Sequence, residues 1–287
     1  MLSRRYRRGI ADCESTVRAS RWFYGQNRAV CSWIDAVGRV ADMPKRIVNR
    51  ATGQTIFRYR GHEMSGPLPP VLYKYLPLQY AQALIETGEL MFSTLSWFKQ
   101  LEDKQRGDRL EGTHVHRPED GLEIIVGQKR TLSQHSFRSD VAGQDYILIY
   151  STSLQRLDNF CAMGENVCIE IHNPTKFKSR LKVTLRRSPP VAKTPLIHDR
   201  VRYYATEDPP GTTYALPDRI VMHKHEGFRD QHEYRFAFGT RSEVFDYERV
   251  QWALQSGDTA ASRRELNESD HRLKIRIGSL TDCCRLL

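Results

Sequence analysis

A polar turn leads directly into an alternating strand pattern at Arg229-Asp230-Gln231-His232-Glu233-Tyr234-Arg235-Phe236-Ala237-Phe238. Aromatic side chains recur there at every second position, which is the period of a strand with one buried face. A carboxylate at the start of such a strand, two residues after an amide, can hold a sugar hydroxyl and stabilise a developing positive charge. The pattern is also that of an ordinary edge strand whose Glu233 faces solvent.

The composition is that of a folded protein with a strong positive charge. The 287 residues are 39% hydrophobic and 27% charged, enough to bury a sizeable core. A formal net charge of +10 favours a polyanionic partner, either nucleic acid or an acidic protein. The cysteines have neither disulfide nor metal-site spacing, and neither a membrane span nor a secretory signal is evident. We therefore expect a cytoplasmic protein without a membrane partner.

Two regions differ in character, residues 1–67 and residues 71–287. The first is a basic, aromatic-rich N-terminal extension in which Arg4, Arg5, Arg7 and Arg8 surround Tyr6. This mixture predicts nucleic-acid binding, because arginines contact phosphates and aromatic rings stack on bases. The alternative is a helical extension that packs its aromatic rings on the main domain. The proline-rich residues 65–70 predict a linker between the two regions.

Residues 71–287 predict many short strands and few helices. The most apolar run, 146–150, predicts a central strand that ends in Ser151-Thr152-Ser153. Gly88 predicts the end of a helix over 78–87. Further strands are expected at 54–60, 71–75, 90–93, 122–126, 167–171, 181–185, 201–204 and 273–278, and a polar helix around 259–267. The charged residues 96–112 predict a surface loop of a length that is often functional, and residues 127–144 a polar, mobile segment.

Two groups of residues contain metal-ligating side chains, but neither has the spacing or the setting of a metal site. The histidines His223, His225 and His232 lack an accompanying carboxylate or cysteine spacing, so we interpret them as solvent-facing. The run Glu102-Asp103-Lys104 has the composition of a metal-dependent nuclease site. It lies in a charged loop rather than on a strand that would hold ligands rigidly, and we expect no metal.

The order of these segments resembles the ADP-ribosyltransferase fold over roughly residues 71–280. The strand at 72–75, the helix ending at Gly88 and the strand at 92–94 look like its opening. Ser151-Thr152-Ser153 and Gln231-x-Glu233 look like the second and third signatures of its Arg-Ser-Glu class. The order is also similar to that of a bacterial domain-of-unknown-function family with a Lys-Tyr strand, a Gly-rich acidic loop, a late Glu-Tyr-Arg strand and a closing Ile-x-Ile-Gly strand. The resemblance implies an α+β split β-sandwich with few helices for residues 71–287.

The first signature departs from that pattern. Members of the class carry an arginine on the first strand, whereas this chain has Lys74 and Tyr75 there. Either Lys74 takes over the phosphate contact or the arginine is Arg58 or Arg60, just upstream. Lysine is a point charge rather than a bidentate fork, so the exchange would loosen the phosphate geometry.

The resemblance implies NAD as a substrate, no metal, and roles for particular residues. Glu233 would stabilise the ribosyl cation, Gln231 would orient the acceptor, and Ser151 would fix Glu233 in place. The cofactor-binding residues would be Lys74, Tyr75, Ser153 and Tyr204. Lys74 would neutralise the pyrophosphate, and Tyr75, Tyr203 or Tyr204 would stack on the nicotinamide.

The acceptor is expected to be a nucleic acid, RNA or DNA, because the chain is basic; a protein acceptor is the alternative. By analogy with the family, such an enzyme would be a toxin or phage-defence effector with an antitoxin or other inhibitory protein as partner. Two other classes remain open: a non-catalytic nucleic-acid-binding module and a metal-dependent nuclease.

Overall fold

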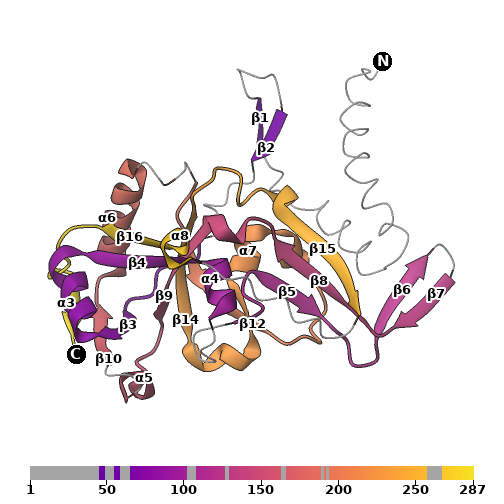
Figure 1. Cartoon of the computed structure of the whole chain (residues 1–287), viewed down its shortest axis with the longest axis horizontal. Helices are drawn as coiled ribbons and strands as arrows, with labels where there is room; N and C mark the ends of the chain where they lie inside the picture. Colours follow the sequence, from indigo (N-terminus) through magenta and orange to yellow (C-terminus); the bar gives the residue numbers. More distant parts are fainter. Residues whose placement is uncertain are drawn as a thin grey trace.

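The computed structural model describes residues 45–48, 55–58, 65–101, 108–126, 129–162, 166–188, 191, 194–256 and 267–287 (Figure 1). Over these residues the chain is mixed α+β, rich in strands arranged in open sheets, with few helices. The predictions for Arg4, Arg5, Arg7, Arg8, Arg60 and Glu102-Asp103-Lys104 lie outside the described residues, as does most of the predicted helix at 259–267.

The strands are β1 (Lys45–Val48), β2 (Thr55–Arg58), β3 (Leu72–Pro77), β4 (Glu89–Thr94), β5 (Thr113–His116), β6 (Leu122–Val126), β7 (Lys129–Ser133), β8 (His135–Val141), β9 (Ile147–Ser153), β10 (Asn166–Ile171), β11 (Ile197–Arg200), β12 (Arg202–Tyr204), β13 (His223–His225), β14 (Glu233–Gly239), β15 (Val250–Ser256), β16 (Arg272–Arg276) and β17 (Cys284–Leu286). The helices are α3 (Leu78–Thr87), α4 (Leu95–Gln100), α5 (Asp158–Ala162), α6 (Pro174–Arg187), α7 (Pro217–Val221) and α8 (Glu268–His271), and η4 (Glu226–Gln231) is a 3-10 turn before β14.

Strand β9 is the centre of the main sheet, whose strand order is β11-β14-β9-β3-β10-β17. One edge of β9 pairs with β14 along the whole strand, from Ser153 opposite Glu233 to Ile147 opposite Gly239. The other edge is shared, because β4 pairs with its beginning and β3 pairs with Ser153 at its end. The sheet therefore divides beside Ser151 into a β4–β16 branch and a β3–β10–β17 branch. We call this point the fork.

Helix α3 joins the two branches, as Figure 1 shows. Its predicted bounds are confirmed, and Gly88 follows it with φ +67 in the left-handed region. A Cβ on Gly88 would lie 2.1 Å from the carbonyl oxygen of Gly278. Glycine is required there for its conformation and for this close approach.

The two faces of the main sheet carry different helices. On one face, Leu148 and Tyr150 of β9 join the aromatic residues of β14 in a core that α6 covers with Phe177, Leu181 and Leu185. On the other face, Ile147 and Ile149 pack with Ala237 and with Ile220 and Val221 of α7. We call these the α6 face and the α7 face. Since side chains alternate along a strand, Ser151, Glu233 and Arg235 belong to the α7 face.

Three structural predictions were wrong. The segment 181–185 is not a strand but part of α6, because Asn173 caps the helix and Phe177, Leu181 and Leu185 recur every fourth residue. No strand was expected in the polar segment 127–144, which contains β7 and β8, each paired with a neighbouring strand. Strand β14 is neither half-buried nor at an edge: all seven residues are buried between β9 and β11.

Two further sheets lie on the α7 side. Strands β15, β8 and β5 form one sheet in that order, and β12 pairs in parallel with β13. Strand β12 covers residues 202–204 of the predicted strand 201–204, so that prediction is confirmed. No helix in the described part of the chain is long and apolar enough to cross a membrane.

Candidate functional site

The carboxylate of Glu233 is surrounded by four hydrogen-bond donors. Its Oε1 accepts from the Ser151 hydroxyl and, at 2.6 Å, from Nε of Arg235. Its Oε2 accepts from Nη2 of Arg235 at 3.1 Å and from Nζ of Lys224 at 3.2 Å. A carboxylate offers about four acceptor positions, so all of them are filled. The residue is 4% exposed and is therefore not the solvent-facing side chain of an edge strand.

Arg235 joins Glu233 to a second carboxylate, that of Glu111. Its Nη1 and Nη2 donate to the two oxygens of Glu111 at 2.5 and 3.0 Å, and Nη1 also donates to the carbonyl of Val221 at 2.7 Å. Nζ of Lys224 lies 3.9 Å from Oε2 of Glu111. We call Glu111, Lys224, Glu233 and Arg235 the charge cluster. It balances two buried anions with two buried cations.

The surroundings shift the pKa values of the two acids of the charge cluster in opposite directions. Burial alone would raise the pKa of Glu233, but the charges of Arg235 and Lys224, with the hydrogen bonds from Arg235 and Ser151, lower it below the usual range. Burial raises the pKa of Glu111 against the same two cations. Glu233 is therefore ionised near neutral pH, and it is suited to stabilise positive charge rather than to donate a proton.

Two other predicted residues lie beside Glu233. The side-chain oxygen of Gln231 accepts from Nζ of Lys224 at 2.9 Å, and the hydroxyl of Ser153 donates to the Gln231 carbonyl at 3.1 Å. Between Gln231 and Glu233, His232 has φ 44, an uncommon left-handed conformation for a non-glycine residue. The turn thereby places the Gln231 and Glu233 side chains on the same lysine.

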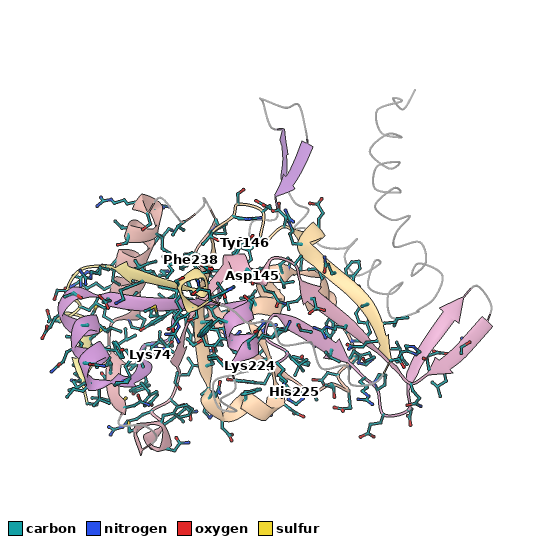
Figure 2. The ribbon with its side chains drawn as sticks, viewed as in Figure 1. Lys74, Asp145, Tyr146, Lys224, His225 and Phe238 are labelled. Carbon is teal, nitrogen blue, oxygen red and sulfur yellow. The ribbon has the colours of Figure 1, made fainter. Side chains whose placement is uncertain are left out.

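Lys74 of β3 contacts β9 at the fork. Its Nζ donates to the backbone carbonyl of Ser151 at 2.7 Å and lies 4.5 Å from the centre of the Tyr150 ring. Figure 2 shows Lys74 and Lys224 coming from different parts of the fold, β3 and β13. Lys224 thus contacts the Glu233 carboxylate, whereas Lys74 contacts the Ser151 backbone and the Tyr150 ring of the α6 face.

The three candidate tyrosines have different surroundings. Tyr203 accepts a hydrogen bond from the Glu233 amide at 2.9 Å, so it contacts the site directly. Tyr204 is buried, with its ring stacked 3.7 Å from that of His114. The Tyr75 hydroxyl accepts from the Leu157 amide at 2.5 Å. Burial raises the pKa of Tyr203 to about 12, so its hydroxyl stays protonated.

Sequence reasoning missed three of the four members of the charge cluster as site residues. Arg235 had a usable signal, because Glu233 and Arg235 are two apart on a strand and share its face. Glu111 precedes Gly112 in the loop expected to be functional, but nothing marked it among the other acids. Lys224 had no local signal, since it lies between two histidines on a three-residue strand.

The interpretation of His223 as solvent-facing is wrong. His223 is 6% exposed, and its Nδ1 lies 3.2 Å from Nδ1 of His114. Burial lowers the pKa of His223 to about 4. His198 on β11 behaves likewise: burial, with the nearby charges of Lys178 and Lys182, lowers its pKa to about 4. Both rings are therefore neutral in the folded protein near neutral pH.

Acidification from pH 7 to pH 5 is expected to destabilise the fold. An unfolded histidine takes up a proton as the pH falls through about 6.5, whereas His198 and His223 resist protonation until about pH 4. Each contributes a loss of about 2 kcal/mol at pH 5 by linkage. The carboxyl of Asp218 on α7, whose pKa burial raises to about 6, offsets about 1 kcal/mol of this loss. Denaturant unfolding at both pH values should show a net loss of at least about 3 kcal/mol. Equal stability at the two pH values would contradict this assignment.

Asp218 on α7 is a buried acid whose two carboxylate oxygens have no hydrogen-bond partner within the described structure. Burial raises its pKa to about 6. The protonated form is favoured in the folded state, so stability is present below about pH 4 and is lost as the pH rises through about 6. Asp218→Asn is expected to stabilise the protein at pH 8 by about 3 kcal/mol, with little effect at pH 3. Paired denaturation curves measure this; a destabilising effect at pH 8 would contradict it.

A pocket of about 430 Å³ lies elsewhere, lined by Asp145, Tyr146, Leu148 and residues of β4 and α8. The pocket opens near the beginning of β9, whereas Ser151 and Ser153 are at the end of that strand. Figure 2 shows Asp145 and Tyr146 set apart from Lys74 and Lys224. In the ranges that the structure describes, no three His, Cys, Asp or Glu side chains gather as a metal-binding group.

Once one of its four donors moves away, the ionised Glu233 carboxylate can accept from a substrate hydroxyl and stabilise positive charge. No protein-family model, curated protein or solved structure matches the chain.

Proposed function

We propose that the chain is an NAD-dependent ADP-ribosyltransferase with a split β-sheet of that fold type, in which Glu233 stabilises the ribosyl cation. The observation that supports this most is the hydrogen bond from the Ser151 hydroxyl to the Glu233 carboxylate, across 82 residues of sequence. The two segments that resemble family signatures thus meet on the adjacent strands β9 and β14. Gln231 and Ser153 lie beside them, and Lys74 donates to the Ser151 backbone carbonyl from the fork.

In the proposed reaction, the bond between the nicotinamide nitrogen and ribose C1′ breaks, and its electron pair leaves with nicotinamide. The positive charge that develops on the ribose is stabilised by the Glu233 carboxylate, which is ionised before the substrate arrives. A nucleophilic atom of the acceptor then bonds to C1′ and loses its proton to solvent water. Glu233 acts through charge and position, which matches its lowered pKa.

Lys224 has a distinct part in this proposal. The acceptor positions of Glu233 are filled, so a ribose hydroxyl must replace one donor. Lys224 makes the longest of the four contacts, at 3.2 Å, and its four-carbon stem can move more easily than the doubly bound Arg235. Once displaced from Glu233, the ammonium group of Lys224 is also available to bind the NAD pyrophosphate. Lys74 is the second candidate for that phosphate contact.

The proposed acceptor is a nucleic acid, RNA or DNA, supported by the net charge of +10. A protein acceptor is the alternative. Because uncontrolled consumption of NAD and modification of nucleic acid would harm the cell that makes the protein, we infer a toxin or phage-defence effector held in check by an inhibitory protein.

The test is incubation of the full chain with NAD labelled in its adenylate phosphate, together with RNA, DNA or cell lysate. The proposal expects release of nicotinamide and label that nuclease digestion removes from the product. Label that only protease removes would assign a protein acceptor. Cleavage of nucleic acid that requires Mg²⁺ and ignores NAD would favour a nuclease, and binding without turnover would favour a non-catalytic module.

A further inference from the structure

Helix α6 carries six basic side chains and no acidic one, over the sequence Pro-Thr-Lys-Phe-Lys-Ser-Arg-Leu-Lys-Val-Thr-Leu-Arg-Arg. Its apolar stripe, Phe177, Leu181 and Leu185, is buried in the core. At 3.6 residues per turn, the basic residues fall into two rows on either flank of that stripe. One row holds Lys176, Arg180 and Arg187, and the other holds Lys178, Lys182 and Arg186.

The protein neutralises these two rows differently. Lys176 and Arg180 both pair with Asp282, and Arg180 does so through two hydrogen bonds at 2.7 and 2.9 Å. Within the described ranges, Lys178, Lys182 and Arg186 have no ion pair with a carboxylate, and in the first row the same holds for Arg187. We call Lys178, Lys182 and Arg186 the unpaired row. Lys178 and Lys182 contribute to the lowered pKa of His198, so their charges act over the neighbouring β11 as well.

The unpaired row lies on the α6 face, whereas Glu233 and Ser151 lie on the α7 face of the same sheet. Figure 1 shows α6 at the end of the molecule that carries α3 and β16. A ligand held by the unpaired row would therefore be held away from the charge cluster. Its role would be to retain a large partner on the protein rather than to orient the reacting atom.

We propose that the unpaired row binds the phosphate backbone of a nucleic acid. Residues four apart on a helix rise about 6 Å along its axis, so the row presents three cations in sequence to a polyanion. Cations without a carboxylate partner among the described residues keep their charge for a ligand, and their contacts release counterions on binding. A membrane surface fits less well, because the apolar stripe that would insert into it is buried in the core. This inference does not depend on the proposed reaction.

The experiment measures binding of the full chain to short fluorescent single-stranded RNA and DNA over a series of salt concentrations. The variant Lys178→Gln/Lys182→Gln/Arg186→Gln removes three proposed phosphate contacts. The slope of log K against log salt should become shallower by about 2, at about 0.7 per contact with a single strand. Affinity at low salt should fall more than tenfold. Glutamine retains good helix propensity, and circular dichroism verifies that α6 remains folded.

The matched control is Lys274→Gln/Arg276→Gln/Arg285→Gln. It removes the same formal charge, but Lys274 and Arg276 pair with Glu89, and Arg285 pairs with Glu170. The slope of log K against log salt for this variant should differ from that of the unmodified chain by no more than about 0.7, the value for one contact. Equal slope changes in both variants would show a general effect of net charge and overturn the inference. So would polyglutamate competing as well as nucleic acid, which would indicate an acidic protein partner.

Nicotinamide release without nucleic acid separates this inference from the proposed function. The unpaired-row variant should release nicotinamide from NAD at the unmodified rate, because its changes lie on the other face of the sheet. A chain that never turns over NAD but loses nucleic-acid affinity in this variant would refute the enzyme and keep the binding surface. A variant with unchanged affinity would refute the surface alone.

Discussion

Arg235→Met is expected to lower the free energy of unfolding by about 3–5 kcal/mol, the usual cost of leaving buried charges without their partner. Arg235 is fully buried and supplies both carboxylates of the charge cluster with hydrogen bonds. Its removal leaves Glu111 and Glu233 with Lys224 as their one counter-charge in the cluster. Since whole domains are stable by only about 5–15 kcal/mol, the variant should melt far below the unmodified protein or fail to fold.

The control for this prediction is Arg285→Met. Arg285 is also ion-paired, through Glu170, but its side chain is 64% exposed. Exposed pairs contribute about 0–1 kcal/mol, so its denaturation midpoint should barely move. Similar midpoints for the two variants would mean that the charge cluster does not hold the sheet together.

Glu233→Gln is expected to reduce transfer of ADP-ribose by about 10²–10³-fold, the range observed when one preorganised stabilising group is removed. Glutamine keeps the shape of the side chain but lacks the negative charge that would stabilise the ribosyl cation. It also presents an amide donor to Arg235 and Lys224, so stability falls as well. Rates must be measured at a temperature at which both proteins are folded, as circular dichroism verifies.

Glu111→Gln serves as the matched variant. It removes the same charge from the same arginine, but Glu111 has no contact with Ser151. It should lose stability while its transfer rate stays within about tenfold of the unmodified rate, a change of about 1.4 kcal/mol in barrier. Parallel losses of transfer in the two variants would mean that Glu233 acts through folding alone.

The parts of the fold that could be predicted are those whose signals are local. Helix α3 was predicted to the residue because an apolar spacing and a C-terminal glycine agree. Strand β9 was predicted because a run of apolar, β-branched and aromatic residues is typical of a central strand. For the site, the contact between Ser151 and Glu233 was expected because two short motifs, in the right order, resemble family signatures.

The parts that could not be predicted depend on contacts between distant residues. Leu181 and Leu185 fit a short apolar strand as well as a helix, and the capping residue Asn173 decides between them. The bond between Arg235 and Glu111 spans 124 residues, and no local pattern indicates it. Burial of β14 on both faces also follows from its place between β9 and β11, which the alternation of its side chains does not reveal.

The most direct test of the central claim is mass spectrometry of a short RNA and a short DNA after incubation with the full chain and NAD. We predict a product heavier by one ADP-ribose, formed in equal amount with free nicotinamide, and at least about a hundredfold less of it with folded Glu233→Gln. Unchanged oligonucleotides and intact NAD with the unmodified chain would contradict the account, as would equal modification by the two proteins.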